Sequence, residues 1–160
     1  MNRSVRTRRS RHAFTLAEGL TAALIIGIFT AVLIPAGVAY LRAQERDQAA
    51  TSLSAAVSAH ELVYSRFAEF SADPQQLSAM VGQLEYGTTS TGPQQVAVAV
   101  GVTDLNGGET VAAAIAAVSD GRTCSYTLVP SPDSRAERLD GEIGTATCEA
   151  SDVSAQAGLR

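Results

Sequence analysis

The chain has 160 residues, of which 46% are hydrophobic, and this length fits one domain of modest size rather than a multidomain enzyme. Its charge is unevenly distributed: five of the 12 basic residues precede Ala13, and all 16 acidic residues lie at or after Glu18. The part after Ala13 therefore has 7 basic and 16 acidic residues, a net charge of −9. Nucleic-acid binding needs Lys and Arg to neutralise phosphates, so we predict no nucleic-acid partner.

A basic run and a long apolar segment occupy the first quarter of the chain. The basic run contains Arg3, Arg6, Arg8, Arg9 and Arg11. The 23 residues from Gly19 to Leu41 then include no Asp, Glu, Lys, Arg or His. As a helix this segment would measure roughly 34 Å, slightly more than the roughly 30 Å hydrocarbon core of a bilayer. We predict a membrane-spanning helix, with the arginines holding the N-terminus in the cytoplasm and the chain after Leu41 on the other side.

Glu18 lies at the mouth of this apolar segment. A carboxylate at the centre of a bilayer costs about 2.5 to 3.5 kcal/mol, and less near the interface, so such a residue usually has a partner. Its position leaves two interpretations open. The side chain either reaches interfacial water or serves a function that supplies a cation.

The segment Phe14 to Leu20 (FTLAEGL), with a basic leader before it and an apolar helix with a single proline after it, resembles the N-terminus of type IV pilins and pseudopilins. The resemblance implies that a prepilin peptidase of the inner membrane cuts between Ala13 and Phe14, and that the new amine of Phe14 is methylated. It also implies that Glu18 pairs with this amine of a neighbouring subunit during assembly. Pro35 falls where the family commonly has a proline that perturbs the helix. The residue before the cut, Ala13, is usually Gly in the family.

Two other export signals remain open for the leader. The segment Thr7 to Ser10 (TRRS) resembles a twin-arginine signal, although Arg11 and His12 follow where apolar residues are expected. A secretory signal cut after Gly37-Val38-Ala39 would give a mature chain that starts near Tyr40. The apolar segment is longer than the core of about 7 to 15 residues that such a signal has.

The helical pattern continues beyond the apolar segment. Apolar residues recur at three- and four-residue steps from Leu53 to Phe70, and no Gly or Pro lies between Val38 and Asp73. We therefore predict one helix from Phe14 to Phe70, half in the membrane and half as the spine of an outer domain.

A second helix and a connector are expected next. Asp73-Pro74 offers an N-cap followed by proline at the first helical position, which predicts a short helix through Leu77, Met80 and Val81 and leaves an extension to Leu84 open. The segment Gly87 to Pro93 (GTTSTGP) is rich in turn residues and predicts a flexible connector.

The period changes to two from Val96 to Val102, where valines alternate with Ala or Gly, and this predicts a strand with a valine face. Asn106-Gly107 predicts a hairpin turn after it. The alanine-rich segment Thr110 to Val118 lies between this turn and a second turn signal, Asp120-Gly121, so we predict a strand there too. Two more strands are expected, at Thr123–Val129 and Ile143–Cys148.

The predicted fold class is α+β. A long N-terminal helix, with a transmembrane half and a soluble half, packs through its apolar stripe on a small antiparallel sheet of three or four strands. This layout is also that of the pilin family. The expected organisation is a leader (1–13), the transmembrane and assembly half of the helix (14–41) and an exported globular domain (42–160).

Cys124 and Cys148 are the only cysteines in the sequence. In an exported domain two cysteines predict one disulfide, and closing a loop of about 25 residues would stabilise the fold by roughly 3.5 kcal/mol in the chain-entropy model. Free thiols are the alternative. The resemblance implies that the enclosed loop is the disulfide-bounded C-terminal region of many pilins.

The sequence contains no pattern typical of a catalytic site or a metal centre. His60 takes an apolar position of the long helix, which is typical of a packed residue rather than a general base. The segment Asp104 to Glu109 opens like a calcium loop but lacks the later ligands, so the hairpin turn is favoured. Four acidic residues lie where some pseudopilins hold calcium, but the pattern favours a solvated loop: Asp133, Glu137, Asp140 and Glu142. We predict no enzymatic activity, cofactor or metal.

The resemblance implies a structural subunit of a type IV pilus or a related filament, assembled through the N-terminal helices. Its partners would be prepilin peptidase, copies of itself and other pilins, the pilus or secretion assembly machinery, and the inner membrane before assembly. The chain would lie first in the bacterial cytoplasmic membrane and then in an extracellular filament. Two alternatives remain: a pseudopilin of type II secretion or a minor or competence pilin, and an exported membrane-anchored binding domain that never polymerises.

Overall fold

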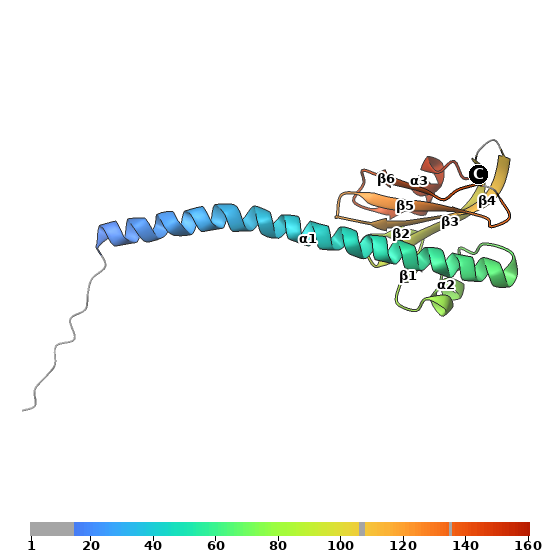
Figure 1. Cartoon of the computed structure of the whole chain (residues 1–160), viewed down its shortest axis with the longest axis horizontal. Helices are drawn as coiled ribbons and strands as arrows, with labels where there is room; N and C mark the ends of the chain where they lie inside the picture. The colour runs from blue at the N-terminus through green and yellow to red at the C-terminus, as the bar shows by residue number, and fades with distance from the viewer. Residues whose placement is uncertain (1–14, 106–107, 135) are drawn as a thin grey trace, which may run out of the picture. The chain divides into compact units, whose positions relative to one another are not determined.

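The computed structural model describes residues 15–105, 108–134 and 136–160. Contacts between residues divide the chain into two compact units, Met1–Ala39 and Tyr40–Arg160. Helix α1 (Leu16–Phe67) contributes to both units (Figure 1).

In the first unit, α1 is regular and exposed on all sides. Its large apolar side chains, from Leu16 to Val38, are between 42% and 83% exposed. This part of the helix is long and apolar enough to cross a membrane, as the sequence predicts. The predicted first helical residue, Phe14, lies outside the described residues.

In the second unit, α1 ends at Phe67 rather than at Phe70. Ala68 has a φ of 58°, in the left-handed region, and its N–H still donates to the Tyr64 carbonyl at 2.8 Å. The chain then turns back, and the Phe70 ring lies 4.9 Å from that of Tyr64 between centroids. Phe70 therefore joins the apolar stripe from outside the helix, which is why the sequence pattern extends the helix too far.

Helix α2 (Pro74–Met80) begins where the sequence predicts. The Asp73 carboxylate accepts a hydrogen bond from the Gln75 N–H at 2.9 Å, which satisfies one of the free donors of the first turn. The helix ends at Met80 with Val81 as its C-cap, so the predicted helix is one residue too long and the open extension to Leu84 does not form.

The predicted flexible connector at 87–93 is also wrong, because it overlaps two short strands. These are β1 (Glu85–Gly87) and β2 (Thr89–Ser90). Strand β1 pairs in parallel with β3 (Gln95–Leu105), and β2 pairs with β7 (Cys148–Glu149). A strand of two or three residues forms because a neighbouring strand offers it backbone hydrogen bonds. Its own residues can therefore be of the types that favour turns.

The main sheet has five strands in the order β1-β3-β4-β5-β6 (Figure 1). Strands β4 (Gly108–Val118), β5 (Cys124–Pro130) and β6 (Leu139–Ile143) continue antiparallel from β3. The sheet is therefore mixed and larger than the predicted antiparallel sheet of three or four strands. The α+β class and the helix-on-sheet arrangement agree with the prediction.

The β3–β4 pair confirms the predicted hairpin partners. It extends from Ala97 opposite Ala116 to Leu105 opposite Gly108. The turn itself, Asn106-Gly107, lies outside the described residues. The alanine-rich β4 is a strand because it has neighbours on both sides, β3 and β5.

The last predicted strand, Ile143–Cys148, is wrong. Strand β6 ends at Ile143, β7 begins at Cys148, and the residues between them belong to neither strand. A helix that the sequence analysis did not predict, α3 (Ala150–Gln156), follows β7 directly.

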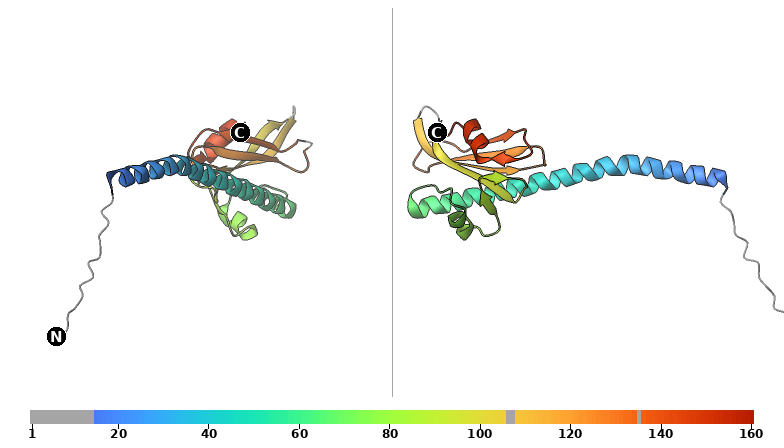
Figure 2. Two further views of the ribbon diagram at one scale, coloured as in Figure 1. Left: turned by 60° about the vertical axis from the view of Figure 1, so that its left-hand side comes forward. Right: turned by 180° about the vertical axis from the view of Figure 1, so that it is seen from behind.

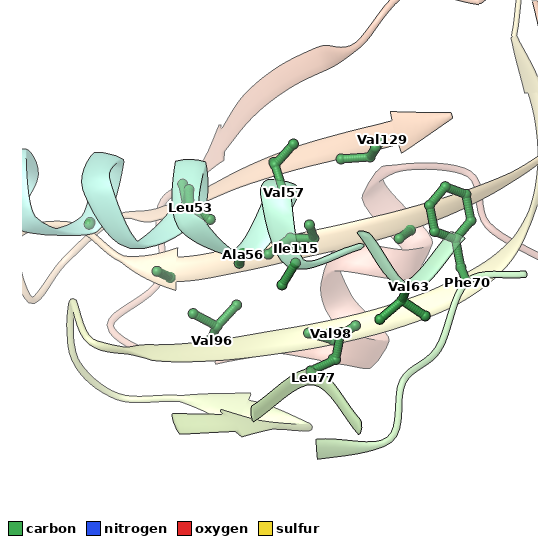
Figure 3. Close-up of a cluster of buried hydrophobic side chains, with 14 residues drawn as sticks. Leu53, Ala56, Val57, Val63, Phe70, Leu77, Val96, Val98, Ile115 and Val129 are labelled. Carbon is green, nitrogen blue, oxygen red and sulfur yellow. The ribbon is translucent and has the colours of Figure 1, made fainter. Parts of the chain in front are cut away.

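The main sheet is covered on both faces in the second unit. The later part of α1 lies along one face and α3 covers the other (Figure 2). On the α1 face, Leu53 and Val57 pack with Val96, Val98 and Ile115 (Figure 3), which confirms the predicted valine face at Val96 and Val98.

The opposite face of the sheet is built from small residues. Ala97, Ala114 and Ala116 are buried there with Leu128 and with Val153 of α3. The sequence analysis did not predict this second core. Because alanines leave little volume to fill, the short α3 packs close to the sheet.

Candidate assembly site at the start of helix α1

The first turn of α1 holds Glu18 by three hydrogen bonds with Thr15. Oε2 of Glu18 accepts hydrogen bonds from the Thr15 N–H and from the Thr15 hydroxyl, both at 2.9 Å. The Glu18 N–H donates to Oγ1 of Thr15 at 3.3 Å. This is a capping box, in which Thr15 is the N-cap and Glu18 the third helical residue. It fixes the helix start at Leu16.

The capping box leaves one carboxylate oxygen of Glu18 available. Both hydrogen bonds reach Oε2, and across residues 15–105, 108–134 and 136–160 neither a hydrogen bond to Oε1 nor an ion pair of Glu18 is present. The side chain also lies at the positive end of the helix dipole, which favours its charge. Glu18 is therefore positioned by its own helix, exposed and without a full cationic partner in the described chain.

The sequence analysis missed this capping box. The signal was present, because Thr15 and Glu18 have the Thr-x-x-Glu spacing directly before an apolar run. The proposed cleavage site, Ala13 and Phe14, lies outside the described residues. Thr15 is the first described residue after it.

The hydroxyl groups in the apolar part of α1 bond to the helix itself. Oγ1 of Thr21 donates to the Ala17 carbonyl at 3.0 Å, and Oγ1 of Thr30 donates to the Ile26 carbonyl at 2.9 Å. These threonines therefore present methyl groups rather than free donors to the surroundings. The helix is continuous through Pro35, and the predicted perturbation in a packed filament stays a prediction.

The chain matches no known protein family, no characterised protein and no solved structure. Interpretation of the site therefore depends on its residues and geometry.

The two cysteines form the predicted disulfide. Cys124 at the start of β5 is bonded to Cys148 of β7, with their Cα atoms 5.4 Å apart. Both residues are buried. The bond therefore ties the small β2–β7 sheet, and the start of α3 after it, to the main sheet.

His60 lies inside the core. Its Nδ1–H donates to the Ala56 carbonyl at 2.8 Å, and Nε2 is buried without a hydrogen-bond partner among the described residues. Burial lowers the pKa of His60 below its ordinary value, because a charged imidazolium would lose its water. A side chain in this position is shielded from a dissolved substrate.

The acidic residues of the predicted calcium-like segments have separate partners. Asp133 accepts a hydrogen bond from the Tyr64 hydroxyl at 2.8 Å, and Asp140 accepts one from Thr127 at 2.6 Å. Within the part of the chain that the structure describes, Glu137 and Glu142 join no group of three or more His, Cys, Asp or Glu that could hold a metal ion. Asp104 faces Glu109 across the β3–β4 pair.

Two polar contacts hold the later part of α1 to the loops of the domain, and the sequence analysis predicted neither. Near one end, Nη2 of Arg46 lies 2.8 Å from Oδ2 of Asp120. The hydrogen bond from Arg46 lowers the pKa of Asp120. Near the other end, Tyr64 donates to Asp133. These contacts join residues 74 and 69 positions apart, so local patterns contain no signal for them.

Proposed function

We propose that this chain is a pilin-like structural subunit of a type IV pilus or a related filament, such as the pseudopilus of a secretion system. In this proposal the first part of α1 anchors the chain in the bacterial cytoplasmic membrane with its N-terminus inside. Prepilin peptidase trims the chain between Ala13 and Phe14. The helix then leaves the bilayer and packs beside the helices of other copies.

The observation that carries the proposal is the position of Glu18. It is the only charged residue from Thr15 to Leu41, and the cut would create an amine four positions before it. The capping box occupies Oε2 and leaves Oε1 for a cation. In an apolar surrounding an unpaired carboxylate is costly, and the Phe14 amine of a neighbouring copy would supply the missing charge.

The exposed apolar surface of the same segment supports this proposal. Every large apolar side chain from Leu16 to Val38 is exposed in the single chain. Such a surface needs lipid or other helices around it. In a filament subunit this surface is surrounded first by membrane lipid and then by the helices of neighbouring copies.

A second function is favoured by the capping box. If Glu18 serves only its own helix, the chain is an exported binding domain on a membrane anchor that never polymerises. In that case the hydrogen bonds with Thr15 are the whole role of the carboxylate.

A matched pair of substitutions separates the two functions. Glu18→Gln removes the charge but keeps an acceptor for the capping box, because Gln also serves at this position. Thr15→Val removes the hydroxyl of the cap but keeps the carboxylate. For a filament subunit we expect Glu18→Gln to insert in the membrane but to be absent from sheared surface filaments, whereas Thr15→Val is incorporated. Normal incorporation of Glu18→Gln would contradict the charge pairing.

Mass spectrometry of sheared surface material tests the processing step. We expect a peptide that begins at methylated Phe14. A mature chain that begins at Met1 or near Tyr40 would support the anchored or secreted alternatives instead. Replacing Ala13 by a bulky residue should leave the unprocessed chain in the membrane.

A further inference from the structure

Strand β3 is covered unevenly on its two sides. Strand β4 pairs with it from Ala97 to Leu105, but on the other side β1 pairs only with Gln95–Ala97. Beyond that point the outer side of β3 would present free backbone groups. Such an edge is a template for pairing with another chain.

The end of the described chain covers this edge. The Val102 N–H donates to the Arg160 carbonyl at 3.1 Å, and the Arg160 N–H donates to the Val102 carbonyl at 2.8 Å. Next to this pair, the Thr103 hydroxyl donates to the Ala157 carbonyl at 3.1 Å. We call Leu159–Arg160 the strap, because it crosses β3 at the part that β1 does not reach.

Two glycines allow the strap to reach β3. Gly158 has a φ of 68°, which L side chains rarely adopt, and it turns the chain after α3. A Cβ at Gly101 would lie 3.0 Å from the Arg160 carbonyl oxygen and 3.2 Å from Cβ of Leu159. The absence of a side chain at Gly101 therefore makes room for the strap.

The sequence of β3 is suited to pairing with itself. Beyond β1, residues Val98 to Thr103 (VAVGVT) contain no charge and no proline, and most of them favour strands. The chain after Ala13 has a net charge of −9, which opposes close contact between the charged surfaces of two copies. Along this stretch two copies would meet without like charges.

We propose that the strap closes the outer edge of β3, and that displacing it lets this edge pair with the same edge of a second copy of the chain. In a strand, the backbone N–H and C=O groups of successive residues point to opposite edges. Those of Val100 and Asp104 therefore point to the same edge as those of Val102. The pairing is isologous, with one two-fold axis between the strands. It is independent of the proposed assembly through α1.

The test uses the full chain in detergent micelles and two variants that release the strap. Gly101→Val places a side chain where the strap lies, and deletion of Leu159 and Arg160 removes the strap without changing β3. We expect amide exchange at Val102 to rise at least tenfold in both variants at low concentration. At higher concentration the protein mass from light scattering should double, and the Val100 and Asp104 amides should become protected.

Two matched controls separate edge pairing from general damage. Gly144→Val adds the same side chain where nothing lies within 4 Å, and Leu159→Ala trims the strap but keeps its backbone bonds. Both should keep the mass and the Val102 protection of the unmodified chain. Association through α1 would be the same in every variant, so only the difference from the unmodified chain counts.

Several results would overturn the proposal. Fast exchange at Val102 with an unchanged mass in both strap variants would show that the free edge does not pair. Unchanged exchange after the deletion would show that the strap does not protect β3. If Gly101→Val does not fold, the deletion variant decides, because its β3 is intact.

Discussion

The two parts of helix α1 differ in whether the rest of the same chain covers their apolar side chains. In the part up to Ala39, large apolar side chains such as Leu33 are exposed, 64% in that case. In the later part, Leu53 and Val63 are buried against the sheet and α2. Both parts are rich in apolar residues, but only the later part finds its partner within the same chain. Apolar composition thus predicts that a surface needs an apolar surrounding. The fold decides whether that surrounding comes from the same chain.

Matched leucines in the two parts should give the largest contrast. Leu53 is 6% exposed and Leu33 is 64% exposed. We expect Leu53→Ala to lower the free energy of unfolding of the second unit by about 2 to 5 kcal/mol, because it leaves a cavity in the core. Leu33→Ala should leave that free energy unchanged. Urea unfolding in detergent, followed by tyrosine fluorescence, measures both, and similar losses for the two variants would contradict the comparison.

A charge in the apolar part should affect the membrane and not the fold. Leu33→Arg is expected to raise the apparent free energy of insertion by about 3 to 4 kcal/mol and to reduce the membrane fraction after alkaline extraction. Unfolding of the second unit should not change. Leu62→Arg is the control, since Leu62 is 52% exposed in the later part of the helix and should alter neither quantity. Full membrane retention of Leu33→Arg would argue against a spanning segment.

The buried His60 should make only the second unit sensitive to acid. Its pKa in the folded state is lowered from an ordinary 6.5, so the unfolded chain binds a proton more readily. Stability is therefore fully present above about pH 6.5 and falls as the pH drops from there toward the folded pKa. His60→Leu should flatten this dependence below about pH 6.5 in urea unfolding. An equal slope in the variant would assign the acid sensitivity to other groups.

The smallest effect is expected at the contact between Arg46 and Asp120. The pKa of Asp120 is lowered by the hydrogen bond from Arg46, so this contribution to stability is present at neutral pH and lost as the pH falls through the folded pKa. Arg46→Gln should raise the pKa of Asp120, as followed by carbon NMR of its carboxyl group. Arg66→Gln removes the same charge elsewhere on α1 and should leave Asp120 unchanged.

Features that depend on neighbouring residues were predictable from the sequence. The N-cap at Asp73, the valine alternation of β3 and the length of the uncharged segment each follow from local spacing. The disulfide between Cys124 and Cys148 was predictable because no other cysteine competes. Glu18 was singled out by its position and given a role by resemblance, but its bonds to Thr15 were overlooked although the spacing indicates them.

Features that depend on distant partners were missed. Strand β1 has three residues and exists because β3 offers it an edge. Ile143 and Cys148 were predicted in one strand but belong to two, because Ile143 pairs with β5 and Cys148 pairs with β2. The end of α1 was misplaced because Phe70 packs on the stripe from the following turn.

By itself the sequence determined the apolar period, the caps and the uncharged stretch that needs an apolar surrounding, because each is set by residues a few positions apart. Only the tertiary structure decided which surface covers which, where the short strands form and which edge of β3 the strap closes. The physical reason is that a backbone hydrogen bond is indifferent to the side chains on either strand. Its partner is therefore chosen by the packing of the whole domain.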